Sequence, residues 1–167
     1  MLDSDRLVHD LLGKNEVRAA VAASLGTEPL PAGNEGRRRI AEIVFTDDEQ
    51  LDRLEAILFP KVAAEIDRWM KSDATAKAML AVVELPMLFE AKLEPAFDKI
   101  VLVTAPQEIR QLRHEGRVGL ADFERRASRQ LPEDQKRTRS DFFYDNTGSP
   151  EELDEFVAAT TAAIVTG

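Results

Sequence analysis

The sequence has 167 residues, 44% of them hydrophobic and 32% charged, which is enough for one domain of ordinary size with a buried core. This composition excludes a disordered chain, and the lack of cysteine excludes a disulfide framework or a thiolate metal site. No apolar run has membrane-spanning length, and the formal net charge of −9 argues against non-specific nucleic-acid binding. We therefore expect a cytoplasmic protein that binds neither nucleic acid nor membranes.

The first 77 residues are expected to form helices, and no segment there is a strong strand candidate. Asn15 is a possible N-cap of the second helix, and Gly26 follows its end. Thr46 and Glu49 have the spacing of a capping box at the start of the fourth helix. Pro60 is expected to end that helix and open the next, because a helix interior needs the N–H that proline lacks. The expected helices cover residues 6–12, 15–25, 37–45, 46–59 and 60–73.

Three strands are expected in the second half. Residues 78–85 and 98–105 contain continuous apolar runs, typical of strands covered on both faces in a parallel sheet, and residues 141–145 form a weaker candidate. This alternation of strands and helices predicts an α/β domain with a parallel sheet. The expected helices cover residues 86–93, 106–117 and 150–165, the last with a capping box of Ser149 and Glu152.

Positive charge is concentrated between Arg110 and Arg139. This segment holds nine Lys or Arg residues and five Asp or Glu residues, a local net charge of +4 in an otherwise acidic chain. Such a segment is a reasonable place for a bound anion. A solvated helix face with internal ion pairs explains the same pattern equally well.

Six segments carry a family resemblance by their shared order and spacing. They are "LDSDRLVHDLL", "RRRIAEIVFTDDEQLDRLEAILFPKV", "VVELPMLFE", "FDKIVLVTAPQEIRQLRHEGR", "RRASRQLP" and "SDFFYDNTGSPEEL", and they are similar to dephospho-coenzyme A kinases. The resemblance implies a P-loop kinase fold, in which helices flank a parallel sheet, in a single domain over residues 1–167. It also implies a helical substrate-binding part at about residues 6–76 and a lid at about residues 113–139.

The reaction implied by the resemblance is transfer of the γ-phosphoryl group of ATP to the ribose 3′-hydroxyl of dephospho-coenzyme A. This is the last step of coenzyme A biosynthesis. ATP and dephospho-coenzyme A would be the small-molecule ligands, with Mg²⁺ as the metal ion and no tightly bound cofactor.

Asp5 matches the catalytic aspartate of the family. A ribose hydroxyl is a weak nucleophile, so a carboxylate within hydrogen-bond reach must orient it and accept its proton. Asp3 matches the first acid of the same D-x-D pair, and we expect it to support substrate binding. The alternative is that Asp3 or Asp5 caps the helix that follows.

Three arginines match phosphate-binding positions of the family. The migrating phosphoryl group spreads negative charge over its oxygens, and catalysis consists mostly of positioning and cationic stabilisation. Arg113 matches the arginine on the lid side, near the phosphates. Arg117 lies one helical turn further along, and Arg126 matches a further lid arginine.

The ends of two expected strands carry further matches. Glu84 follows an apolar run, where P-loop enzymes often place an acid that holds magnesium or its water, although the family residue varies. Leu88, Phe89 and Glu90 match the substrate-side turn of the family. Core packing is the alternative for Leu88 and Phe89.

Asn146 and Gly148 match the loop that would flank the adenine of ATP. Both residue types are also common in tight turns, which is the alternative for this loop. One departure from the family is Phe59, which stands before Pro60 where the family usually has histidine.

The P-loop pattern G-x-x-x-x-G-K-[ST] does not occur in these residues. In the family this loop and its strand precede the D-x-D pair, so we expect Met1 to fall inside the domain and the first, central strand to be missing. The strands at 78–85 and 98–105 would then pair directly, leave a gap or borrow a strand. We expect marginal stability and little kinase activity from the chain alone.

Two other hypotheses are compatible with the sequence. One is a non-catalytic relative that binds coenzyme A or regulates another protein. The other is a kinase of the same fold that acts on a different nucleoside-like acceptor. The oligomeric state is not predicted.

Overall fold

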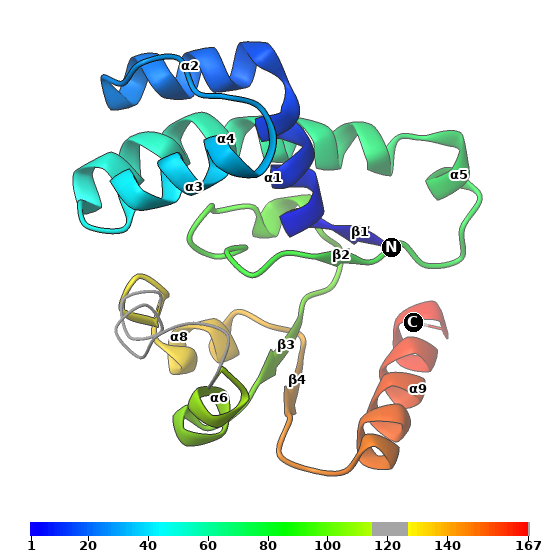
Figure 1. Ribbon diagram of the computed structural model, residues 1–167. Coiled ribbons are helices and arrows are strands. Elements are labelled where there is room, and N and C mark those ends of the chain that lie inside the picture. The colour runs from blue at the N-terminus through cyan, green and yellow to red at the C-terminus, as the bar shows by residue number, and fades with distance from the viewer. Residues whose placement is uncertain (115–126, 167) are drawn as a thin grey trace. The chain divides into compact units, whose positions relative to one another are not determined.

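The computed structural model describes residues 1–114 and 127–166. The chain divides into two compact units, Met1–Pro86 and Met87–Gly167, coloured blue to green and green to red in Figure 1. The single domain expected over residues 1–167 stays a prediction. No helix among the described residues is long and apolar enough to cross a membrane.

The first unit is a helical bundle with a short parallel strand pair. Its strands pair with Leu2 opposite Val83 and Asp3 opposite Glu84. The elements are β1 (Leu2–Asp3), α1 (Ser4–Gly13), α2 (Asn15–Leu25), α3 (Gly33–Val44), α4 (Asp48–Met70), α5 (Asp73–Ala76) and β2 (Val83–Glu84).

The strand predictions for this unit were partly wrong. Strand β1 was not expected, and the strand expected at residues 78–85 is reduced to Val83–Glu84. A strand needs a hydrogen-bonding neighbour, and the two residues of β1 supply one only for these two positions. Met79, in the same apolar run, is 82% exposed.

Helix α4 runs without interruption through Pro60, so the predicted break was wrong. Its buried residues are Leu54, Leu58, Val62 and Ile66, which follow one another at intervals of four on both sides of the proline. Burying such side chains stabilises by about 1.5–3 kcal/mol each. This outweighs the cost of one interior proline, about 3 kcal/mol.

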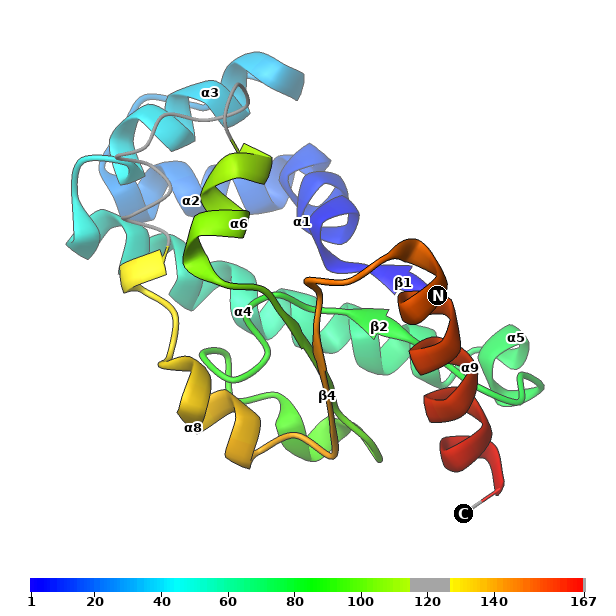
Figure 2. The same ribbon diagram turned by 90° about the horizontal axis from the view of Figure 1, so that it is seen from below.

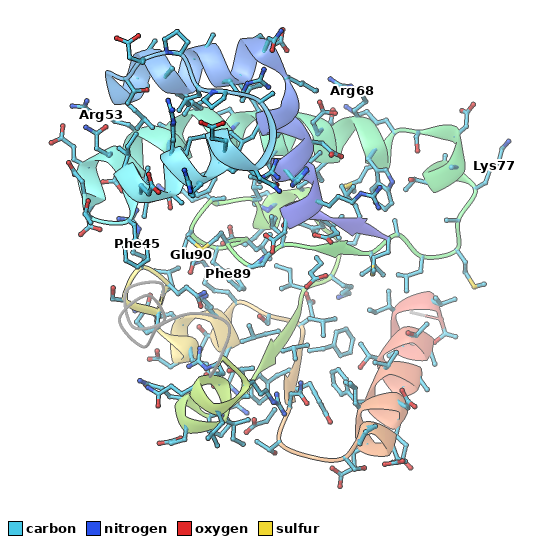
Figure 3. The ribbon with its side chains drawn as sticks, in the orientation of Figure 1. Phe45, Arg53, Arg68, Lys77, Phe89 and Glu90 are labelled. Atoms are coloured by element: carbon cyan, nitrogen blue, oxygen red, sulfur yellow. The ribbon has the colours of Figure 1, made fainter. Side chains whose placement is uncertain are left out.

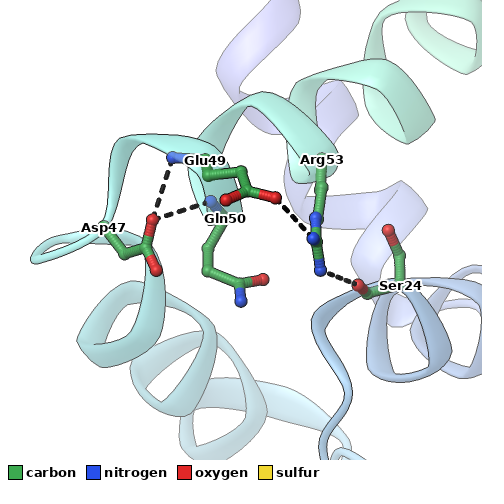
Figure 4. Close-up of polar contacts among 5 residues, drawn as sticks. All are labelled: Ser24, Asp47, Glu49, Gln50 and Arg53. Carbon is green, nitrogen blue, oxygen red and sulfur yellow. Dashed lines mark hydrogen bonds and ion pairs between the residues drawn. The ribbon is translucent and has the colours of Figure 1, made fainter.

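Helix α4 begins with a cap that the sequence placed one residue too early. The Asp47 carboxylate, and not Thr46, accepts the N–H groups of Glu49 at 2.9 Å and Gln50 at 3.2 Å (Figure 4). At α2 the N-cap is Lys14, so the prediction of Asn15 was wrong by one residue. Gly26 ends α2 as predicted, in the left-handed region at φ 65°.

The core of the first unit lies where α1, α2 and α3 pack on α4 (Figure 2). Two polar contacts join α2 to α4 at its ends. Lys14 Nζ lies 2.8 Å from Glu65 Oε1, and Arg53 donates to the carbonyl of Ser24 at 3.4 Å (Figure 4). The buried core residues are Leu12, Val17, Val21, Ala22, Leu25, Leu30, Ile40, Leu54 and Leu58.

The second unit is built on a parallel pair of four-residue strands. The register runs from Val101 opposite Phe142 to Thr104 opposite Asp145. Figures 1 and 2 show α6 and α8 on one side of this pair and α9 on the other. The elements are η1 (Glu94–Ala96), β3 (Val101–Thr104), α6 (Gln107–His114), α8 (Glu133–Thr138), β4 (Phe142–Asp145) and α9 (Pro150–Thr166).

Several predictions for this unit are confirmed. Strands β3 and β4 lie within the predicted segments 98–105 and 141–145. The capping box of α9 is present, because Ser149 N–H donates to Glu152 Oε2 at 3.0 Å and Glu152 N–H to Ser149 Oγ at 3.3 Å. The expected cover on both faces of β3 was wrong, since Val101 and Val103 are 41% and 54% exposed.

Residues 86–93 form turns and not the predicted helix. The N–H of Leu93 donates to the carbonyl of Leu88 at 3.0 Å, and that of Lys92 to Phe89 at 3.1 Å. This is the Schellman pattern that ends a helix, and it follows only one helical hydrogen bond. Lys92 takes the left-handed position at φ 56°, which a non-glycine residue adopts only at a cost.

Candidate active site

The D-x-D pair lies where β1 passes into α1. The Asp3 carboxylate caps α1, because its Oδ1 accepts the N–H groups of Asp5 at 2.9 Å and Arg6 at 3.2 Å. Capping therefore accounts for Asp3, one of the two residues for which it was considered. A hydrogen-bonded carboxylate at this position also fixes the direction in which the first turn of α1 begins.

Asp5 is in the first turn of α1 and is exposed. Within residues 1–114 and 127–166, no hydrogen bond or ion pair involves its carboxylate. Asp5 is thus a solvent-accessible carboxylate on a capped helical turn, where it can accept a proton from a bound substrate.

Glu84 lies beside this pair. The β1–β2 register places it opposite Asp3 at the carboxyl ends of two parallel strands, where α/β proteins bind ligands. Its carboxylate oxygens are donors that Mg²⁺ accepts. The part of the chain that the structure describes contains no group of three or more metal-ligating side chains. A metal bound at Glu84 would need further oxygens from water or from ATP.

In the second unit, Arg113 and Asn146 are brought together. Arg113 Nη2 donates to the backbone carbonyl of Asn146 at 3.1 Å, so α6 is joined to the loop that follows β4. The N–H of Asn146 donates to Thr104 at 2.7 Å, which continues the β3–β4 ladder by one residue. A guanidinium is therefore held at the carboxyl ends of this strand pair.

Gly148 lies close to the side chain of Glu152. A Cβ atom there would displace the carboxylate of Glu152 from the N–H of Ser149, to which it is hydrogen-bonded at the start of α9. This contact supports the turn alternative for Gly148. A role for Gly148 or Asn146 beside adenine stays a prediction.

The predicted substrate-side turn, in which Figure 3 labels Phe89 and Glu90, makes contacts within the protein. Phe89 is 5% exposed, and the Arg139 guanidinium lies 5.0 Å from its ring centroid. Packing therefore accounts for Phe89, while Leu88 is half-buried. Glu90 Oε1 accepts from Lys136 Nζ at 2.9 Å and from the N–H of Leu131 at 2.8 Å.

Sequence reasoning did not single out Lys136 or Arg139, which contact this turn. Both were counted in the +4 segment, but their partners, Glu90 and Glu94, lie outside that segment, and the Lys136 side chain is only 8% exposed. For these two residues the expected solvated face with ion pairs inside the segment was therefore wrong. Arg117 and Arg126 lie outside the described residues.

An open pocket of about 230 Å³ lies among α1, α2 and α4 in the first unit. Two of its basic residues, Lys14 and Arg68, form ion pairs with Glu65, which also lines the pocket. Hydrogen bonds from Lys14 and then Arg68 hold the pKa of Glu65 below its ordinary value. The contact between Lys14 and Glu65 joins the N-terminal end of α2 to α4. The lining residues are Leu11, Lys14, Glu16, Val17, Lys61, Ala64, Glu65 and Arg68.

Comparison with known proteins shows which family has a similar sequence. The family model described as dephospho-CoA kinase matches residues 1–152. A dephospho-CoA kinase from Brucella melitensis is 32% identical over 166 residues, covering 98% of this chain and 80% of that protein. The enzyme named so in Aquifex aeolicus is 34% identical over 155 residues (91% and 78%), and that in Thermus thermophilus is 36% identical over 142 residues (84% and 68%).

The solved structure of dephospho-CoA kinase from Campylobacter jejuni superposes with a TM-score of 0.67 at 24% identity, covering 99% of this chain and 85% of that one. The fold is thus the α/β fold of P-loop kinases, as predicted. The chain belongs to the dephospho-CoA kinase family, whose members catalyse the last step of coenzyme A biosynthesis.

Proposed function

We propose that this chain binds dephospho-coenzyme A and presents the ribose 3′-hydroxyl for phosphorylation by ATP. One observation carries the proposal. In a chain whose residues 1–152 match the family, Asp3 is occupied as a helix cap while the neighbouring Asp5 carboxylate stays exposed. Asp5 is therefore the residue of the pair whose carboxylate does not serve as the cap of α1.

Asp5 acts as the general base in this proposal. Its carboxylate accepts a hydrogen bond from the 3′-hydroxyl and takes the proton as the oxygen attacks the γ-phosphorus of ATP. Asp3 acts indirectly, because its cap fixes the start of α1 and so the place of Asp5. The product is coenzyme A, and ADP leaves.

Cations stabilise the transferred phosphoryl group. Arg113 supplies a guanidinium at the carboxyl ends of β3 and β4, and we assign Arg117 and Arg126 to the same task from the family match. Glu84 would hold Mg²⁺ through a water molecule. The ion would supply charge neutralisation at the phosphate oxygens.

The remaining matched residues bind the two substrates in this proposal. Leu88, Phe89 and Glu90 form the turn against which the acceptor lies. The backbone of Asn146 and Gly148 flanks the adenine of ATP. The contacts of Phe89 and Glu90 inside the protein mean that this turn acts mainly through its backbone and shape.

The 167 residues contain no phosphate-binding loop, so the lysine and N–H groups that hold the β- and γ-phosphates are not among them. We expect this polypeptide on its own to release ADP far more slowly than an ordinary kinase. Turnover with dephospho-coenzyme A at about 1–100 per second would contradict this expectation.

The acceptor site is tested by calorimetric titration of the full chain. Dephospho-coenzyme A should bind, and Asp5→Ala should weaken binding about tenfold, because a hydrogen bond to a charged group is lost. Asp10→Ala, an exposed change on the same helix, is the control and should leave the dissociation constant unchanged. Equal affinities of wild type and Asp5→Ala would contradict the role of Asp5.

The same titration tests the alternative of a non-catalytic coenzyme A-binding relative. A kinase acceptor site distinguishes the substrate from its 3′-phosphorylated product. Equal binding of coenzyme A and dephospho-coenzyme A, both unaffected by Asp5→Ala, would favour the binding module.

A further inference from the structure

A buried polar cluster joins residues 86–93 to helix α8 within the second unit. The side chains of Glu90 and Lys136 are 10% and 8% exposed, and their ion pair is 2.9 Å long. Glu90 Oε1 also accepts the N–H of Leu131 at 2.8 Å, and Lys136 Nζ also donates to Gln130 Oε1 at 3.2 Å. We call Glu90, Gln130, Leu131 and Lys136 the Glu90–Lys136 cluster.

Both charges of this ion pair are buried. Lysine and glutamate are almost never this buried unless they are paired, because removing either charge from water is costly. A hydrophobic pair of similar volume would give equal or greater stability. It would not, however, reproduce the hydrogen bond from Leu131 that fixes the direction of the Glu90 side chain.

A second pair reinforces the first. Arg139 follows α8 directly, pairs with Glu94 and lies over the ring of Phe89. Two bases three residues apart thus hold two acids four residues apart. The turn between the acids therefore has both of its sides fixed to the α8 region.

The turn needs such support because its own backbone is strained. Lys92 holds the left-handed position of the Schellman pattern, where glycine is usual. A strained conformation persists only where its surroundings determine it, and this occurs most often at binding and catalytic sites. The ion pairs of Glu90 and Glu94, on either side of Lys92, hold the backbone in this conformation.

We propose that Lys136 is a positioning residue for the acceptor substrate, holding Glu90 and with it the turn 86–93 in the conformation that dephospho-coenzyme A contacts. This inference rests on the proposed function, in which that turn lines the acceptor site. Lys136 itself touches no substrate. Its effect is on acceptor affinity, and ATP affinity is independent of it.

Four variants of the full chain test the proposal. Lys136→Met removes one charge, and the double variant Glu90→Leu with Lys136→Met replaces the pair by apolar groups. Lys136→Arg keeps the charge. The control is Lys99→Met, which breaks the more exposed pair with Asp141 at 3.0 Å in the same unit. Stability is followed by hydrogen-exchange mass spectrometry of β3 and β4, and affinities for dephospho-coenzyme A and ATP by calorimetry.

The expected pattern separates positioning from stability. Lys136→Met should lose exchange protection and bind dephospho-coenzyme A about tenfold more weakly, with ATP binding unchanged. The double variant should regain protection and stay weak for the acceptor, Lys136→Arg should recover part of the affinity, and Lys99→Met should bind normally.

Recovery of acceptor affinity in the double variant would show a purely structural pair and overturn the proposal. Unchanged affinity in Lys136→Met would overturn it too. If the wild-type chain itself bound no dephospho-coenzyme A, the proposed function would fail together with this inference, and that outcome is distinct from a failure seen only in the variants.

Discussion

Replacement of Pro60 by alanine should stabilise the helical unit. Pro60 is exposed, so the change removes no buried contact, and alanine supplies an N–H four residues after the carbonyl of Ala56. An interior proline costs a helix about 3 kcal/mol relative to alanine. The unfolded state of the alanine variant has more conformational entropy, which offsets about 1 kcal/mol of this gain. The net gain should be about 2 kcal/mol.

Trp69, the single tryptophan of the chain, lies in α4 and reports the unfolding of this unit by its fluorescence. A gain of this size should raise the melting temperature by roughly 10 °C. The control is Pro150→Ala, at the first residue of α9, where proline loses no helical hydrogen bond. An unchanged or lower melting temperature for Pro60→Ala would refute the reasoning that buried side chains carry α4 through its proline.

Three further changes test the local structure. Asp47→Ala should lower the stability of the helical unit by about 1 kcal/mol in urea titrations read at the tryptophan, because α4 loses its cap, while Thr46→Ala should have no effect. The lowered pKa of Glu65 stabilises the folded state at pH values above 4.5, the ordinary pKa of the group, and this contribution should disappear as the pH falls through the lowered pKa. In thermal melts across pH 2–7, Lys14→Met should therefore make the melting temperature less dependent on pH. Lys92→Gly should slow hydrogen exchange in the second unit, since glycine relieves about 1 kcal/mol of left-handed strain; faster exchange would mean that the strain is absent.

Periodicity predicted the helices of the first unit because each one buries a regular apolar stripe. The wrong prediction at Pro60 also concerns this apolar stripe. Local rules place a helix end at a proline, but the stripe from Leu54 to Ile66 continues across it, and packing energy is visible only once α4 has its neighbours. The shift from Thr46 to Asp47 is smaller, since both residues are good caps and only backbone geometry decides between them.

Strand lengths and buried polar contacts depended on distant partners. The apolar run at 78–85 has the composition of a buried strand, yet only Val83 and Glu84 lie opposite β1. Family motifs identified Glu90 as a residue of interest without its partner. Lys136 is 46 positions further along the chain, and nothing in the local sequence distinguishes it from the neighbouring bases Arg137 and Arg139.

Hydrogen-exchange mass spectrometry with and without dephospho-coenzyme A tests most directly whether the acceptor binds at the D-x-D pair and the turn. We predict slower exchange on binding in two places, residues 2–8 at the start of α1 and residues 86–93. Helix α9 should exchange at an unchanged rate. Saturating ligand that left both segments unaffected, or protected α9 alone, would contradict the account.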